Sequence, residues 1–130
     1  DTSQPVEVTS DQLAVNQTDG TAIFTGNVVV IQGHLRMAAE TVRVEYAKDD
    51  TSKVDRILAS GGVTLASATE AAEGNEAVYS VASGEIVMTG DVLLTQNGGT
   101  IAGQKLIVDL ETGTGRMDGR VKTVLQPKAN

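Results

Sequence analysis

Residues 23–33, "IFTGNVVVIQG", recur with small changes as residues 87–99, "VMTGDVLLTQNGG". In both stretches apolar and polar residues alternate, and Gly26 and Gly90 are each followed by a polar residue and then by valine. Alternation with a period of two is typical of β-strands with one buried face. The repetition predicts a chain built from similar β units.

The repeat extends over the whole chain. A glycine followed by a polar residue or glycine and then valine occurs at Gly26, Gly61, Gly90 and Gly119. A second landmark, a small residue followed by two polar residues and an apolar alternation, occurs at Ser10, Ala39, Gly74 and Gly103. Both landmarks indicate a unit of 29 residues, with six extra residues inserted once around residues 47–53. A fixed period of this size is typical of stacked supersecondary units.

The repeated glycine predicts a bend within a continuing strand. Phe24, Val28 and Val30 keep one phase across Gly26, whereas a two-residue hairpin at this position would break the phase. A glycine allows the backbone to turn a corner because it has no side chain. At the second landmark the phase shifts by one residue, as a β-bulge or corner would shift it.

These patterns predict an all-β fold and a single domain over residues 1–130. We expect a β-jelly-roll, or folded taco, of about 16 short antiparallel strands built from ~29-residue repeats and open at both ends. Only residues 68–77, "ATEAAEGNEA", resemble a helix in composition. The Gly74-Asn75 pair within them favours a turn.

Composition excludes several functions. The chain has no cysteine, three aromatic residues and a net charge of −7. Base stacking therefore has almost no platform, and phosphate backbones would be repelled, so we expect no nucleic-acid partner. No apolar run approaches the roughly 20 residues of a membrane-spanning helix, and no signal-peptide pattern opens the chain.

Nothing in the sequence favours catalysis, a metal or a cofactor. The single histidine, His34, lies in a predicted turn, and no GxSxG motif is present; we expect an exposed turn residue and no enzyme. Residues 48–55, "KDDTSKVD", could collect oxygen ligands for Ca²⁺, but they lack EF-hand spacing and contain competing lysines, which favours a solvated loop.

Several phrases together carry a resemblance to a known family. "FTGNVVVIQG", "LRMAAETVRV", "EIVMTGDVLLTQ", "IAGQKLIVDLETGTGRM" and "VKTVLQP" occur in the order and spacing of the OstA-like family, and the resemblance extends from residue 6 to residue 127. It implies a periplasmic protein of Gram-negative bacteria whose V-shaped jelly roll holds the lipid A acyl chains of lipopolysaccharide. It also implies head-to-tail association that links an inner-membrane lipopolysaccharide transporter complex to an outer-membrane translocon.

The resemblance gives the inward-facing residues a candidate function. A cleft lined by aliphatic side chains can bind acyl chains, although the same alternation also occurs in any packed sandwich core. A related docking or scaffold module with a filled core and no lipid cargo is therefore the alternative, and a sugar-binding jelly roll is disfavoured by the lack of aromatic platforms. The residues predicted to line the interior are Phe24, Val28, Val30, Met37, Val42, Val44, Ile57, Val63, Leu65, Ile86, Met88, Val92, Leu94, Ile101, Leu106, Val108 and Met117, with Leu13 and Val15 in the same phase.

The two ends of the chain carry opposite charge. Residues 1–35 contain four acidic residues and no Lys or Arg, whereas residues 112–130 contain four basic residues and one acidic residue. An open stack also exposes unpaired strand edges at both ends. Edge-to-edge joining of successive copies would satisfy both features; chance asymmetry on a solvated surface is the alternative. The predicted edge residues are Val6, Val8, Val121 and Val124.

Four apolar residues do not fit a simple inside–outside pattern. Val29, Ile31, Leu93 and Ile107 point outward on the predicted phase. They are candidates for surfaces where partners dock.

Overall fold

The computed structural model describes residues 3–127, and within them the regular structure consists of β-strands. The bounds of the strands are β1 Glu7–Thr9, β2 Gln12–Asn16, β3 Thr21–Gln32, β4 Leu35–Tyr46, β5 Val54–Ala66, β6 Glu70–Ser80, β7 Glu85–Gln96, β8 Gly99–Asp109, β9 Thr114–Asp118 and β10 Lys122–Leu125. The predicted all-β class is confirmed. The count differs from the expected sixteen because β3 to β8 are long strands that continue through their bends.

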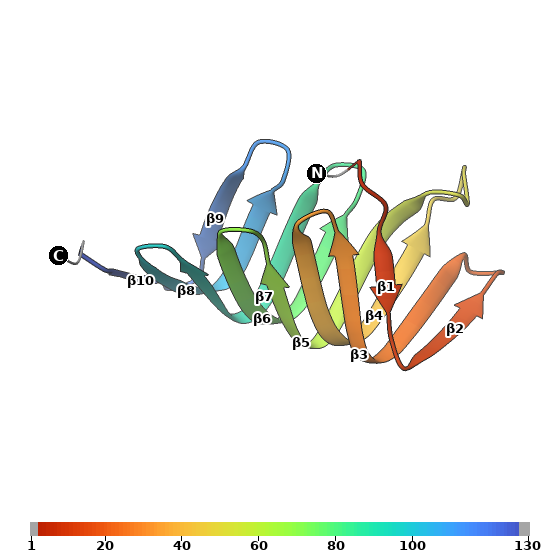
Figure 1. The fold of residues 1–130 in the computed structure, drawn as a ribbon, viewed down its shortest axis with the longest axis horizontal. Helices are drawn as coiled ribbons and strands as arrows, with labels where there is room; N and C mark the ends of the chain where they lie inside the picture. The colour runs from red at the N-terminus through yellow and green to blue at the C-terminus, as the bar shows by residue number, and fades with distance from the viewer. Residues whose placement is uncertain (1–2, 128–130) are drawn as a thin grey trace.

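All ten strands belong to one antiparallel sheet that is not closed (Figure 1). The strands β3 to β8 pair in sequence order. At one edge β1 and β2 pair with the two halves of β3, and at the other edge β10 and β9 pair with the two halves of β8. The sheet therefore has two free edges, one at each end of the strand order.

Each long strand is bent near its middle, so that the sheet folds over on itself. In Figure 1 the bends lie along the lower edge and the two halves of the sheet spread upward from them. We call one half wing A, made of β1, β10 and residues 28–32, 35–39, 63–66, 70–74, 92–96 and 99–103. The other half, wing B, is made of β2, β9 and residues 21–25, 41–46, 54–60, 76–80, 85–89 and 105–109.

Gly26, Gly61 and Gly90 lie at the bends of β3, β5 and β7, where the strand continues as predicted, whereas Gly119 lies between two separate strands, β9 and β10. At the β5 bend Gly61 and Gly62 have φ angles of 84° and 85°, a backbone region that favours glycine. The ladder between β5 and β6 shifts between Ser60 and Val63, where two residues of β5 lie opposite one residue of β6, as in a β-bulge.

At the other three bends the second of the two residues is not glycine. Asn27, Asp91 and Arg120 have φ angles of 49°, 47° and 48°, and asparagine and aspartate adopt this region more readily than most residues. The turn predicted at Gly74-Asn75 is wrong: both residues lie inside β6, where the ladder shifts register and the strand continues. The Gly74-Asn75 pair marks a shift in register, but pairing with β5 on one side and β7 on the other keeps β6 continuous.

The core lies between the two wings. Directly opposite residues of neighbouring strands share a face, and the inner-face residues of both wings pack together in a single cluster. Its buried aliphatic members come from β3 to β8, and alanines at 22, 39, 59, 72 and 77 complete it. The core therefore forms because the bends bring the inner faces of the two wings together.

Candidate functional site

One continuous row of side chains crosses the inner face of wing B from one edge of the sheet to the other. The ladder pairs place eight residues in this row: Leu13, Phe24, Val42, Ala59, Ala77, Met88, Leu106 and Met117. Each of the eight strands in wing B, β2 to β9, contributes an apolar side chain to this row, so the row is apolar along its full length.

The structure places the residues predicted to line the interior on the inner faces of the two wings. The buried ones are Val28, Val30, Met37, Val42, Val44, Ile57, Val63, Leu65, Ile86, Met88, Val92 and Leu106. The partly buried ones are Phe24, Leu94, Ile101, Val108 and Met117. Leu13 and Val15 share the inner face but are 52% and 62% exposed, because β2 lies at a free edge.

The middle of the interior is filled. Ile57, Ile86 and Met88 are among the side chains with less than 2% exposure. Gly74 provides space for Met88, since a Cβ atom at Gly74 would lie 2.7 Å from Met88 Cγ. Such complementary sizes give the close packing of a protein core, so the central residues contact one another in this conformation.

The interior opens toward the C-terminal end of the sheet. A cavity of about 400 Å³ lies there, within the size range of small-molecule sites. Its apolar lining is Leu94, Ile101, Leu106, Val108, Leu110 and Met117, and Glu70, Gln96, Asp109 and Arg116 are among its polar lining residues. We call this cavity the C-terminal opening.

Two smaller spaces continue inward from the C-terminal opening. A space of about 80 Å³ shares Leu94, Leu106, Val108 and Leu110 with it and adds Leu35 and Leu65. A space of about 10 Å³ shares Leu35 and Leu65 and reaches Tyr79 and Gln32. The apolar interior therefore narrows from the C-terminal opening toward β3.

A buried polar contact joins the wings where this path ends. Tyr79 of wing B donates a hydrogen bond from its hydroxyl to Gln32 Oε1 of wing A, with an O–O distance of 2.5 Å. Gln32 Nε2 in turn donates to the backbone oxygen of Gln4 at 2.9 Å. Burial raises the pKa of the Tyr79 phenol above its usual value of 10.0, which keeps the donor protonated. We call this contact the Tyr79–Gln32 clasp.

The free edges hold the residues predicted for association. Val8 lies in β1 and, like Val6, packs partly buried against the core. At the opposite edge Val124 lies in β10 and is 49% exposed, and Val121, which precedes β10, is 46% exposed. Leu13 and Val15 add apolar surface to the N-terminal edge, so both ends of the sheet expose apolar side chains beside unpaired backbone.

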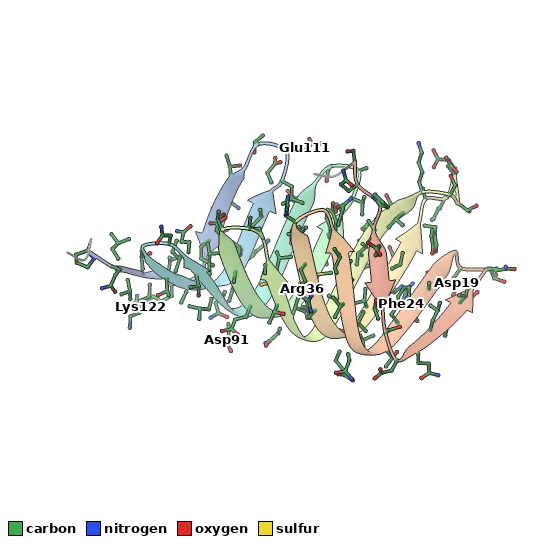
Figure 2. The ribbon with its side chains drawn as sticks, viewed as in Figure 1. Asp19, Phe24, Arg36, Asp91, Glu111 and Lys122 are labelled. Atoms are coloured by element: carbon green, nitrogen blue, oxygen red, sulfur yellow. The ribbon has the colours of Figure 1, made fainter. Side chains whose placement is uncertain are left out.

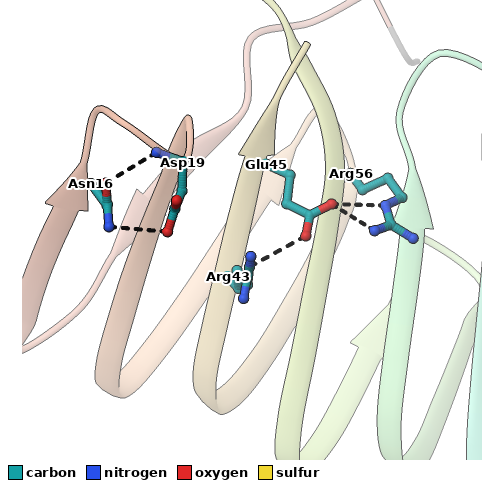
Figure 3. A network of polar contacts seen from close by, with 5 residues as sticks. All are labelled: Asn16, Asp19, Arg43, Glu45 and Arg56. Atoms are coloured by element: carbon teal, nitrogen blue, oxygen red, sulfur yellow. Dashed lines mark hydrogen bonds and ion pairs between the residues drawn. The ribbon is translucent and has the colours of Figure 1, made fainter. Parts of the chain in front are cut away.

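The charges at the ends follow the sequence pattern. Asp19 lies at the β2 end of the molecule and Lys122 at the β10 end (Figure 2). Arg116 forms an ion pair with Asp118 at 3.2 Å within β9, whereas Asp1 and Lys128 lie outside the described residues. On the outer face Glu45 bridges Arg43 and Arg56, and Asn16 and Asp19 bond across the β2–β3 turn (Figure 3). These exposed contacts add little stability.

The outward-pointing apolar residues lie on the outer faces, as the phase predicted. Val29, Leu93 and Ile107 are half-buried, and Ile31 is 36% exposed. A shallow hollow of about 400 Å³ on the outer face of wing B is lined in part by Ile23, Leu58, Val78 and Val87.

The residues considered for catalysis and metal binding lie in exposed turns and loops. His34 is an exposed turn residue. In the loop at residues 47–53 the hydroxyl and backbone N–H of Ser52 donate to Asp50 and hold its pKa below the usual value. Within residues 3–127 no group of three or more His, Asp or Glu could hold a metal ion. The same residues contain no helix that is long and apolar enough to cross a membrane.

Sequence reasoning missed Gln32, Tyr79, Leu35 and Leu110 as parts of the interior. Gln32 has the same phase as Val28 and Val30, so a polar residue in an inward position was the available signal. Tyr79 lies in β6, whose Ala- and Glu-rich sequence hides the alternation of Ala77 and Tyr79. Leu35 and Leu110 border turns, where the phase is hard to assign.

Three relatives match most of the chain. An uncharacterized protein of Rhizobium meliloti is 32% identical over 97% of this chain and 73% of its own length. The lipopolysaccharide export system protein LptH of Pseudomonas aeruginosa is 25% identical over 98% of this chain and 82% of its own length. The lipopolysaccharide export system protein LptA of Escherichia coli K12 is 28% identical over 82% of this chain and 60% of its own length.

The fold matches a solved structure. The crystal structure of LptH from Pseudomonas aeruginosa, the LptA-homologous periplasmic component of a lipopolysaccharide transport device, superposes with a TM-score of 0.88 over 98% of this chain and 99% of that one, at 22% identity. The family model for the LptA/(LptD N-terminal domain) LPS transport protein matches residues 7–114. Together with the folded open sheet, this match shows that the chain belongs to the LptA/LptD N-terminal domain family of lipopolysaccharide transport proteins, which confirms the resemblance found in its sequence.

Proposed function

We propose that this chain is a periplasmic lipopolysaccharide carrier that holds lipid A acyl chains between its two wings. The observation that carries the proposal is the C-terminal opening, in which Leu94, Ile101 and Met117 are among the apolar side chains around a space of about 400 Å³. Lipopolysaccharide is proposed as the cargo because the chain belongs to this family and its named relatives are lipopolysaccharide export proteins.

The energetics suit a carrier that must release its cargo. Each methylene group that leaves water for the apolar interior contributes about 0.8 kcal/mol, so acyl chains supply the affinity. The protein has a net charge of −7, and Arg116 at the opening is already paired with Asp118. The anionic headgroup therefore stays in water, and binding depends on the acyl chains.

We further propose that copies join head to tail and form a bridge from an inner-membrane transporter complex to an outer-membrane translocon. The free edges of β9 and β10 on one copy would pair with those of β2 and β1 on the next. Repeating the in-chain register, in which Met88 lies opposite Leu106 and Leu94 opposite Ile101, places Met117 opposite Leu13 and Thr123 opposite Val8 of the next copy. This contact would cover the exposed Leu13 and Val15. The edge strands of the two copies would lie one ordinary strand spacing apart, so that the two sheets form one continuous sheet.

Native mass spectrometry of the purified protein with and without lipopolysaccharide tests both parts. The proposal predicts bound lipid and a ladder of oligomers that lengthens with protein concentration. A monomer without lipid at all concentrations would contradict it.

The filled middle of the interior favours a second candidate function, a docking module of the same family without lipid cargo. Val28, Val42, Val63 and Val92 are all 1% exposed or less, as expected of a core that packs only against itself. Oligomers that form without any bound lipid in the same experiment would favour this alternative.

A further inference from the structure

The Tyr79–Gln32 clasp is a buried polar contact that joins the two wings deep in the interior. Tyr79 is 3% exposed and Gln32 is 4% exposed, and 47 residues separate them in sequence. A hydrogen bond between buried polar groups is costly to break, because neither group can turn to water. The clasp therefore holds the end of β3 against β6.

The clasp lies at the end of the path that leads from the C-terminal opening. The spaces along this path decrease from about 400 Å³ to about 80 Å³ and then to about 10 Å³ beside the clasp. A space of about 10 Å³ holds at most one water molecule. An acyl chain that enters at Ile101 and passes Leu94 and Leu35 can continue only if the wings separate at Tyr79 and Gln32.

We propose that the Tyr79–Gln32 clasp determines how far an acyl chain can enter, so that a single molecule holds cargo in its C-terminal half while its N-terminal half stays closed. This inference rests on the carrier function proposed above. Tyr79 and Gln32 act as specificity-determining residues, since they limit the length of chain that is bound out of water.

A series of single-chain amphiphiles tests the inference. We would titrate octyl to tetradecyl maltosides, below their critical micelle concentrations, into the wild type and into the Tyr79→Phe and Gln32→Leu variants. Affinity should rise about fourfold with each added methylene, equivalent to about 0.8 kcal/mol, until the chain reaches the clasp, and then level off. In both variants, the chain length at which the affinity stops rising should be longer than in the wild type.

Tyr46→Phe is the matched control, because Tyr46 is the other tyrosine of the chain and packs against the core outside the clasp. The affinity of Tyr46→Phe should stop rising at the same chain length as that of the wild type. If Tyr79→Phe and Gln32→Leu stop gaining affinity at the same chain length as the wild type, the proposed role of the clasp is overturned and the carrier function is not. If the wild type binds none of the maltosides, both the carrier function and this inference are overturned.

The distance between the wing tips provides a second measurement that needs no ligand. His34 and Ala82 lie in exposed turns of the two wings, and the chain has no cysteine, so spin labels can be placed at His34→Cys and Ala82→Cys alone. Tyr79→Phe should broaden the distance distribution toward longer values. A distribution that matches the wild type would overturn the clasp.

Discussion

At the scale of single residues, the fold depends on places where only a small side chain is possible. A Cβ atom at Gly61 would lie 2.7 Å from Glu40 Cβ, whereas one at Gly62 would meet nothing within 4 Å. Both residues have nearly the same positive φ. The two adjacent glycines therefore separate the effect of backbone conformation from the effect of close approach.

Gly61→Ala should destabilise the protein more than Gly62→Ala. Each variant places an alanine at positive φ, at a cost of about 1–2 kcal/mol, but Gly61→Ala also crowds Glu40, which adds about 1 kcal/mol or more. Urea unfolding of both variants measures the difference. Equal losses of unfolding free energy would show that β4 and β5 do not approach as described.

Tyr79 gives the stability of the protein an alkaline limit. Burial raises its pKa above 10.0 in the folded state, so the unfolded chain loses this proton first as the pH rises. The stabilising contribution is complete below about pH 10 and is lost as the pH rises through the folded pKa, with a slope of up to about 1.4 kcal/mol per pH unit. Unfolding free energies of the wild type and Tyr79→Phe, compared from about pH 9 upward, should therefore converge.

Tyr46→Phe keeps Tyr79 and serves as the control for that titration. It should retain the alkaline loss of stability that Tyr79→Phe lacks. If Tyr79→Phe loses stability as steeply as Tyr46→Phe, the phenol of Tyr79 is not protected by the fold.

At the scale of the strands, the sheet is defined by its bends and its two free edges. The bend positions could be predicted because the phase of Phe24 and Val28 continues across Gly26. The number of strands could not, because alternation does not distinguish a bent strand from two strands joined by a turn. The positive φ of Arg120 was also not predictable, since arginine has no preference for that region and adopts it through its place in the repeat.

The repeat also predicts one charged contact between edges. Within the chain, Asp91 at the β7 bend bonds with Gln104 of β8. At the C-terminal edge Arg120 occupies the position of Asp91, and at the N-terminal edge Asp11 occupies the position of Gln104. Head-to-tail pairing in the same register would bring Arg120 to Asp11 of the next copy.

Arg120→Glu should weaken self-association by about fivefold, or ~1 kcal/mol, and the charge swap Arg120→Glu with Asp11→Lys should recover part of the loss. Sedimentation velocity over a range of protein and salt concentrations measures both. Lys48→Glu, in the exposed loop before β5, makes the same charge change away from the edges and should have little effect. Equal association of Arg120→Glu and Lys48→Glu would contradict the proposed register.

At the scale of the whole molecule, one folded sheet combines a filled middle, an open C-terminal end and two free edges. The inner-face residues could be predicted from their phase, and Leu94 and Ile101 were identified in this way. Which of them surround open space could not be predicted, because phase assigns a residue to a face but does not report how closely the facing wing approaches. The clasp was missed for the same reason, since Gln32 and Tyr79 meet only when the wings fold together.

The most direct test of the carrier account compares adjacent leucines on opposite faces of β7. Leu94 lines the C-terminal opening, whereas Leu93 points outward from the same strand, and both are partly buried. The affinity for lipopolysaccharide should fall about tenfold in Leu94→Asn and stay within about twofold of the wild type in Leu93→Asn, with both variants folded by circular dichroism. Equal affinities of the two variants for lipopolysaccharide would contradict binding between the wings.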